Sequence, residues 1–146
     1  MKIINYINRN YSYLYLISLM RYSQQREAIR DIVCGTRLHP TADWVYNKAK
    51  KQIPNISLGT VYRNLGQLVE HQIICAYTIS GFVRYDGNIT EHHHFICDNC
   101  NAIQDIKIRD ENLLSKFKIH TDNIIVSYQM KFRGTCFDCS NEKKRK

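Results

Sequence analysis

Two cysteine pairs stand in the last third of the chain, Cys97-Asp98-Asn99-Cys100 and Cys136-Phe137-Asp138-Cys139. Each C-x-x-C pair forms a tight turn that presents both sulfur atoms to one ion, and two pairs make the tetrahedral four-thiolate set typical of structural zinc. One pair alone would also suit a thioredoxin-like redox centre, but no β-α-β pattern surrounds either pair. We therefore expect Cys97, Cys100, Cys136 and Cys139 to bind a structural zinc ion.

Three consecutive histidines precede the first cysteine pair. If residues 92–96 form a strand, His92 and His94 point to one face and His93 to the other. Two imidazoles on one face can share a metal ion, and Asp86 and Asp105 lie close enough in sequence to join them. The alternative is a solvated run of histidines that binds nothing.

The elements that must position these ligands follow from the periodicity of the back half. Residues 126–132 alternate apolar Val126, Tyr128, Met130 and Phe132 with polar residues, which predicts a half-buried strand. A module of about 60 residues buries little apolar surface by itself, so both zinc and a partner subunit are expected to stabilise it.

The front half is expected to hold three short helices and a hairpin. Ser23 is a candidate N-cap for a helix that ends at Gly35, Thr41 for a second helix, and Ser57 for a third that runs to about His71. Residues 73–85 resemble two strands around a Ser-Gly turn. This order predicts a winged helix-turn-helix whose third helix enters the major groove of DNA. A small helical core with an ordinary polar face is the alternative.

Charge divides the chain of 146 residues, which carries 21 Lys and Arg against 13 Asp and Glu, a net charge of +8. Residues 1–80 have a net charge of +6, residues 81–142 one of −2, and the tail of residues 143–146 adds +4. The excess predicts a polyanionic partner, either nucleic acid or an anionic membrane surface. We place a domain boundary near Arg84, with a DNA-binding domain in residues 1–84 and a sensing domain with a basic tail in residues 85–146.

No apolar run approaches the ~20 residues that span a bilayer. Residues 13–20 loosely resemble a signal peptide, but the run is short and Tyr-rich, so we interpret it as part of a first helix. The expected location is the reducing cytoplasm, where cysteines bind metals more often than they form disulfides. Cys34 and Cys75 lie outside the two pairs and are interpreted as small buried hydrophobic residues.

Several stretches together resemble the ferric uptake regulator (Fur) family of metal-dependent bacterial transcription factors. The resemblance runs from about Arg21 to Ser140. The matching stretches are residues 39–43 (HPTAD), 57–65 (SLGTVYRNL), 84–86 (RYD), 92–100 (HHHFICDNC) and 134–139 (GTCFDC).

The resemblance implies an α+β protein in which a winged helix-turn-helix domain precedes a small α/β dimerisation domain with a four-cysteine zinc site. It implies a homodimer on palindromic, AT-rich double-stranded DNA, with no membrane partner. It also implies a regulatory metal between the two domains, and Fe(II) or Mn(II) suits the mixed nitrogen and oxygen ligands. The matching positions are His39, Asp86, His92, His94 and Asp105. Tyr62 and Arg63 match positions that touch DNA, and on the same helix we assign DNA contact to Ser57, Thr60 and Gln67.

Asp105, where other members carry Glu, resembles the peroxide-sensing repressors of the family. In those proteins bound Fe(II) reacts with hydrogen peroxide, a ligand histidine is oxidised and the DNA is released; the matching ligands are His39 and His92. Iron-responsive repression is the alternative within the family. Tyr128 occupies a position that often carries a histidine of an additional metal site, so we do not expect that site.

Two other classes of function remain as alternatives. A zinc-dependent enzyme is disfavoured because four thiolates close a zinc site, whereas catalytic zinc keeps one position open. A structural zinc adaptor would leave the basic helical half without a purpose. The expected function is therefore that of a metal-dependent repressor and not of an enzyme.

Overall fold

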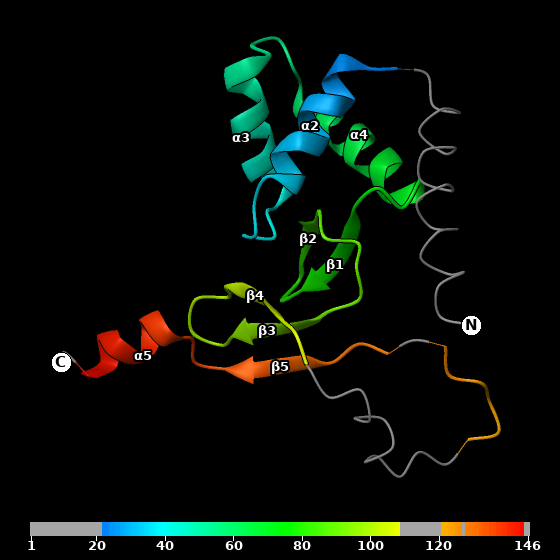
Figure 1. Ribbon diagram of the computed structural model, residues 1–146. Coiled ribbons are helices and arrows are strands. Elements are labelled where there is room, and N and C mark those ends of the chain that lie inside the picture. The colour runs from blue at the N-terminus through cyan, green and yellow to red at the C-terminus, as the bar shows by residue number, and fades with distance from the viewer. Residues whose placement is uncertain (1–21, 109–120, 127, 145–146) are drawn as a thin grey trace. The chain divides into compact units, whose positions relative to one another are not determined.

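The computed structural model describes residues 22–108, 121–126 and 128–144 (Figure 1). The chain divides into two compact units, Met1–Ile89 and Thr90–Lys146. The division comes later than position 84 because a strand of the first unit continues through Asp86. The expected first helix within residues 1–20 lies outside the described ranges. No helix in the described ranges is both long and apolar enough to cross a membrane.

Three helices begin where the sequence places their N-caps. They are α2 (Gln24–Cys34), α3 (Ala42–Gln52) and α4 (Leu58–Glu70). The side-chain oxygens of Ser23, Thr41 and Ser57 each accept a hydrogen bond from the backbone N–H three residues later. Each cap thereby satisfies a donor that the first helical turn leaves unpaired. The three predicted helix starts are confirmed.

The three helices pack around one apolar cluster. α2 contributes Ile29 and Val33, and α3 contributes Val45 and Ala49, all fully buried. The buried positions of α4 and of the following segment are Val61, Leu65, Leu68, Ile73, Ile74 and Tyr85. The spacing of three and four residues along each helix therefore identified the core-facing side correctly.

Asn64 departs from this pattern. The periodicity puts it on the polar face of α4, but its side chain is only 4% exposed. Its Nδ2 donates to the carbonyl oxygen of Thr60, one turn earlier, at 2.8 Å. A buried amide is tolerated there because it is hydrogen-bonded within its own helix.

A hairpin follows α4 in the first unit. β1 (Cys75–Ile79) and β2 (Phe82–Asp86) pair antiparallel, with Cys75 opposite Asp86. The turn residues Ser80 and Gly81 both have positive φ, 52° and 81°, as a tight two-residue hairpin turn requires. Three helices followed by a hairpin is the order expected of a winged helix-turn-helix (Figure 1).

The second unit contains a three-stranded sheet in the order β4-β3-β5. The central strand β3 (His93–Cys97) pairs antiparallel with β4 (Ile103–Ile106) and parallel with β5 (Lys131–Gly134). The helix α5 (Phe137–Lys144) follows β5. A helical front part followed by a β-rich part with four clustered cysteines confirms the α+β expectation.

The expected strand over residues 126–132 is wrong in its extent. Val126 is 91% exposed, and the strand begins only at Lys131. The register explains the difference, because β5 pairs with β3 only from Lys131 opposite His94 to Gly134 opposite Cys97. Ser127 lies outside the described residues.

Candidate metal centres

His39 and Asp86 meet within the first unit. His39 is 2% exposed and has a φ of 48°, a left-handed conformation that few residues other than glycine adopt. Its Nδ1 lies 3.2 Å from the carbonyl oxygen of Arg37. Because a carbonyl only accepts, Nδ1 carries the proton of a neutral ring and Nε2 carries the lone pair. That Nε2 lies 3.4 Å from Oδ2 of Asp86.

The backbone fixes Asp86 as firmly as it fixes His39. Asp86 is 6% exposed, and its Oδ1 accepts from the N–H of Asn88 at 2.8 Å. The preceding residue, Tyr85, donates its N–H to the carbonyl of Pro40 at 2.9 Å. This bond joins the end of β2 to the residue that follows His39. A ring nitrogen and a carboxylate oxygen thus face each other, an arrangement that fits a shared cation.

A second set of ligands lies within the second unit. His92 and His94 share one side of the chain as predicted, with their Nε2 atoms 3.0 Å apart and exposures of 4% and 1%. Asp105 on β4 is the register partner of His94, and its Oδ1 lies 3.6 Å from Nε2 of His92. Nδ1 of His92 lies 2.7 Å from the carbonyl oxygen of Thr90, which directs Nε2 toward the other ligands.

His93 has a different environment, as the alternation of a strand predicts. Its Nδ1 accepts the N–H of Met130 at 3.3 Å, and its ring lies 5.3 Å from that of Tyr128. His93 therefore attaches the segment before β5 to β3. The other histidines and the aspartates offer nitrogen and oxygen ligands without a thiolate, a set that fits Fe(II) or Mn(II).

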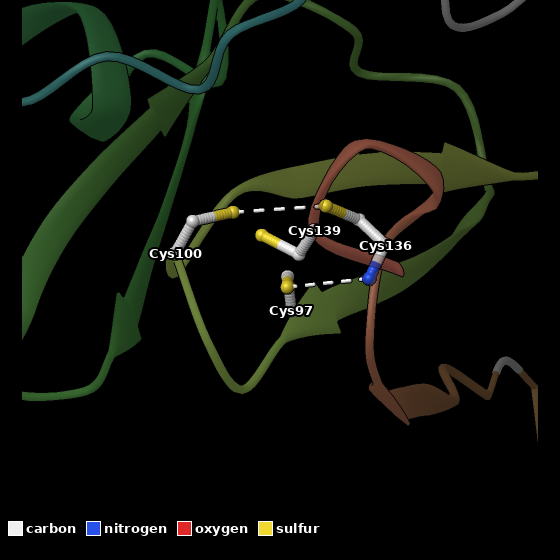
Figure 2. Close-up of side chains that lie close together, drawn as sticks. All are labelled: Cys97, Cys100, Cys136 and Cys139. Carbon is white, nitrogen blue, oxygen red and sulfur yellow. Dashed lines mark hydrogen bonds between the residues drawn. The ribbon is translucent and has the colours of Figure 1, made fainter. Parts of the chain in front are cut away.

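The four cysteines of the two pairs come together in the second unit. Figure 2 shows their sulfur atoms turned toward one another, and all four lie within 4.8 Å of one another. The sulfurs of Cys100 and Cys136 are 3.8 Å apart. A zinc tetrahedron with bonds of ~2.3 Å has sulfur–sulfur edges of about 3.8 Å, whereas a disulfide needs ~2.05 Å. The donor set and its spacing fit structural zinc.

Backbone hydrogen bonds shape the two turns that carry these sulfurs. Asn101 donates its N–H to the carbonyl of Cys97, and Ser140 does the same to Cys136, both at 2.9 Å. Between the turns, the N–H of Asp98 donates to the carbonyl of Gly134 at 2.7 Å. The parallel pairing of β3 and β5 therefore brings two distant C-x-x-C pairs to one place.

The sulfur atoms differ in their affinity for protons. The backbone N–H of Cys136 donates to Sγ of Cys97 at 3.3 Å (Figure 2). This bond, with a further one from the N–H of Cys100, lowers the pKa of Cys97 from 9.0 to about 6. The side chains of Cys136 and Cys100 raise the pKa of Cys139 to about 12. One thiolate therefore forms readily, and the neighbouring thiols resist ionisation until a cation arrives.

The expectation that Cys34 and Cys75 are buried is wrong. Cys34 is exposed and Cys75 is half-buried, and both thiols are free. Cys34 is the last residue of α2. Partial burial still raises the pKa of each thiol.

The residues assigned to DNA divide into two groups on α4. Tyr62 is 49% exposed and Arg63 is also exposed, so both are open to a partner. Ser57 and Thr60 make the helix cap, with their hydroxyl oxygens 2.9 Å apart. Gln67 accepts a hydrogen bond from Arg26 of α2 at 3.2 Å.

Sequence reasoning did not identify Arg26 or Gln129 as structural contacts. Arg26 is 8% exposed, and its spacing of three residues before Ile29 on the buried face of α2 was the available signal. Gln129 contacts the backbone of His92 and the ring of His94. No local pattern marks Gln129, because residues 92–94 meet it only through the pairing of β3 with β5.

Comparison with known proteins gives a consistent result. Residues 18–133 match the model of the ferric uptake regulator family. The peroxide-responsive repressor PerR of Staphylococcus aureus (strain USA300) is 31% identical over 125 residues, which cover 84% of each chain.

Two solved structures share the fold at somewhat lower identity. The ferric uptake regulator of Francisella tularensis with iron is 25% identical with a TM-score of 0.71, over 84% of this chain and 96% of that one. The Campylobacter jejuni peroxide stress regulator is 26% identical with a TM-score of 0.64, over 95% of this chain and all of the other. The protein described here therefore belongs to the ferric uptake regulator family and is a metal-dependent transcriptional regulator, not an enzyme.

Proposed function

We propose that this protein is a cytoplasmic, homodimeric repressor that senses peroxide through a regulatory Fe(II) or Mn(II) ion and binds a palindromic, AT-rich operator. The structural zinc is held by Cys97, Cys100, Cys136 and Cys139. The regulatory ion is held by His39 and Asp86 of the first unit together with His92, His94 and Asp105 of the second.

The observation that carries the proposal is the ligand set around Asp105. An aspartate stands at the position where other members carry Glu, and its Oδ1 lies 3.6 Å from Nε2 of His92. The peroxide-responsive relative at 31% identity supports the same branch. Ligands without sulfur also favour a metal that reacts with peroxide over zinc.

The chain's own residues supply the coupling between metal and DNA. His39 and Asp86 belong to the unit that carries α4, whereas the other three ligands belong to the sheet unit. Ligands drawn from both units restrict the hinge between them to one arrangement, and DNA selects that arrangement. Fe(II), when bound, supplies the redox chemistry by which peroxide oxidises a ligand histidine, and His39 and His92 match the oxidised positions.

An iron-responsive repressor is the second candidate, and it is favoured by the likeness to the Francisella tularensis regulator. The two candidates differ in one respect. A peroxide sensor loses its DNA when peroxide reaches the Fe(II) form but keeps it in the Mn(II) form, whereas an iron-responsive repressor follows metal concentration alone.

A mobility-shift assay separates the two candidates. The probe is a palindromic AT-rich duplex selected from random sequence with the Mn(II)-loaded protein, tested with Mn(II), with Fe(II), and with each metal plus peroxide. We expect release only with Fe(II) and peroxide together, accompanied by a mass gain of one oxygen on the peptide with His39 or His92. Binding that ignores both metals would overturn the regulatory site.

Asp105→Glu is the matched variant for this assay. It keeps the charge and the carboxylate but extends the side chain by one methylene. We expect the variant to bind DNA with Mn(II) as before and to keep its DNA when Fe(II) and peroxide are added. An unchanged peroxide response would show that Asp105 does not determine the sensing branch.

Arg63→Ala tests α4 as the DNA-reading helix. Arg63 is exposed and lies beside the exposed Tyr62, so its removal disturbs no buried contact. A base-contacting arginine is worth about 1–3 kcal/mol, so we expect at least a several-fold loss of operator affinity with unchanged zinc and manganese content. Equal affinity would count against α4 as the reader.

The homodimer is supported by apolar surface in the second unit. Ile124 and Val126 are 90% and 91% exposed, and Phe132 on β5 is 38% exposed. Large apolar side chains left in water favour association. Sedimentation equilibrium of the zinc-loaded protein tests this, and a monomer at micromolar concentration would contradict it.

A further inference from the structure

His94 is oriented differently from the other candidate histidine ligands. His39 and His92 each place Nδ1 near the carbonyl oxygen of the residue two positions earlier, at 3.2 Å and 2.7 Å. Nδ1 of His94 instead lies 3.5 Å from the side-chain amide nitrogen of Gln129. The same amide nitrogen lies 3.4 Å from the backbone carbonyl oxygen of His92.

The bonding network assigns the ring protons, given that both rings are neutral. Nδ1 of His92 donates to Thr90, so its Nε2 has the lone pair and accepts. The partner at 3.0 Å is Nε2 of His94, which must therefore carry the proton of that ring. Nδ1 of His94 is then an acceptor, which agrees with the N–H group of Gln129 directed at it.

This arrangement opposes metal binding by His94 through Nε2. A ligand nitrogen must have a free lone pair, so the proton has to move from Nε2 to Nδ1 when a metal is bound. Nδ1–H then needs an acceptor, and the amide of Gln129 supplies one if it rotates to present Oε1. A glutamine offers both a donor and an acceptor, so it can serve either form of the ring.

We propose that Gln129 is a positioning residue that sets the ring tautomer of His94 and thereby controls how tightly the regulatory metal binds. This inference rests on the proposed function, in which His94 is a ligand. Gln129 contacts the ligand and not the metal, so it acts only through the orientation and proton of that ring.

The backbone holds Gln129 at this place. On its C-terminal side, Met130 donates its N–H to Nδ1 of His93 and accepts the N–H of His94 at 3.2 Å. On its N-terminal side, the ring of Tyr128 lies against that of His93. The side chain of Gln129 is exposed, so its replacement leaves the buried contacts of the unit intact.

The test compares Gln129→Glu and Gln129→Leu with the wild-type chain, all zinc-loaded and free of regulatory metal. A carboxylate only accepts, so Gln129→Glu favours the Nδ1–H form and we expect tighter Mn(II) binding. Gln129→Leu offers no partner, and we expect affinity to fall about tenfold, as for other outer ligand partners. Gln104→Glu, an exposed position on β4 next to Asp105, adds the same charge without touching His94 and is the control.

Nitrogen-15 NMR of the histidine rings provides a readout that needs no metal. We expect the proton of His94 on Nε2 in the wild-type and Gln104→Glu chains and on Nδ1 in Gln129→Glu. An Nδ1 proton already present in the wild-type chain would overturn the inference. So would Mn(II) affinities that do not differ between Gln129→Glu and Gln104→Glu.

These outcomes are distinct from failure of the proposed function. If the wild-type chain does not bind Mn(II), the regulatory site is wrong, and the NMR measurement still decides whether Gln129 sets the tautomer. If the wild-type chain binds Mn(II) and His94→Ala does not, the site stands. The two Gln129 variants then decide the inference.

Discussion

The four thiols of the zinc group differ in how easily they lose a proton. Cys97 lies at the end of β3, where two backbone N–H groups stabilise its thiolate and lower its pKa to about 6. Cys139 shares its surroundings with other sulfurs, which raise its pKa to about 12. At neutral pH, Cys97 therefore offers a thiolate before zinc arrives, and the metal must displace the proton of Cys139.

We predict that zinc uptake releases fewer than four protons at pH 7.5. Cys97 is already ionised above its pKa of about 6, so it contributes no proton there. As the pH falls through 6 its thiolate is lost, and the number of protons released per zinc rises by about one. Calorimetric titration in buffers of different ionisation enthalpy measures this number at pH 7.5 and 5.5. The same number at both values would contradict the assignment of the low pKa.

Two glycines at the scale of the elements have opposite structural roles. Gly66 lies in the exposed middle of α4, and a Cβ added there meets nothing within 4 Å. Gly87 follows β2, and a Cβ added there would lie 2.5 Å from Cα of Cys34, a backbone atom that cannot move aside. Glycine is therefore a cost in α4 but a requirement where β2 passes the end of α2.

We predict that Gly66→Ala stabilises the first unit and that Gly87→Ala destabilises it. An alanine in a helix interior is favoured over glycine by up to about 1 kcal/mol. Overpacking against backbone costs about 1–3 kcal/mol. Urea denaturation followed by helix signal, at one protein concentration, measures both free energies of unfolding. A loss of stability in Gly66→Ala would show that α4 needs this glycine for packing.

Local signals in the sequence predicted those parts of the fold that neighbouring residues determine. Helix caps and apolar spacing placed α2, α3 and α4, and the Ser-Gly turn placed the hairpin. The start of β5 and the helix α5 were not predicted, because pairing with β3 and closure of the cysteine group determine them.

The candidate sites follow the same division. Spacing alone grouped the four cysteines, and strand alternation put His92 and His94 on one side. The pairing of His39 with Asp86 came from the family resemblance, because more than forty residues separate them in the chain. Gln129 was missed because its contact with His94 crosses two strands that are distant in sequence.

At the scale of the whole molecule, the two units rely on different sources of stability. The first unit has a continuous apolar core drawn from three helices and the hairpin. In the described part of the second unit, the buried apolar residues are Ile96, Cys97, Ile103 and Cys136, and two of these are zinc ligands. The second unit therefore depends on its metal in a way that the first does not.

We predict that loss of zinc unfolds the second unit and leaves the first folded. Structural zinc in small domains contributes about 10–16 kcal/mol of binding free energy, more than the few buried apolar side chains of this sheet can replace. In Cys136→Ser, amide hydrogen exchange should accelerate across β3 and β5 while protection in α2 to α4 is kept. Cys34→Ser is the matched control, because Cys34 is exposed and outside the zinc group. Full zinc content in Cys136→Ser, or equal loss of protection in both units, would refute this division of stability.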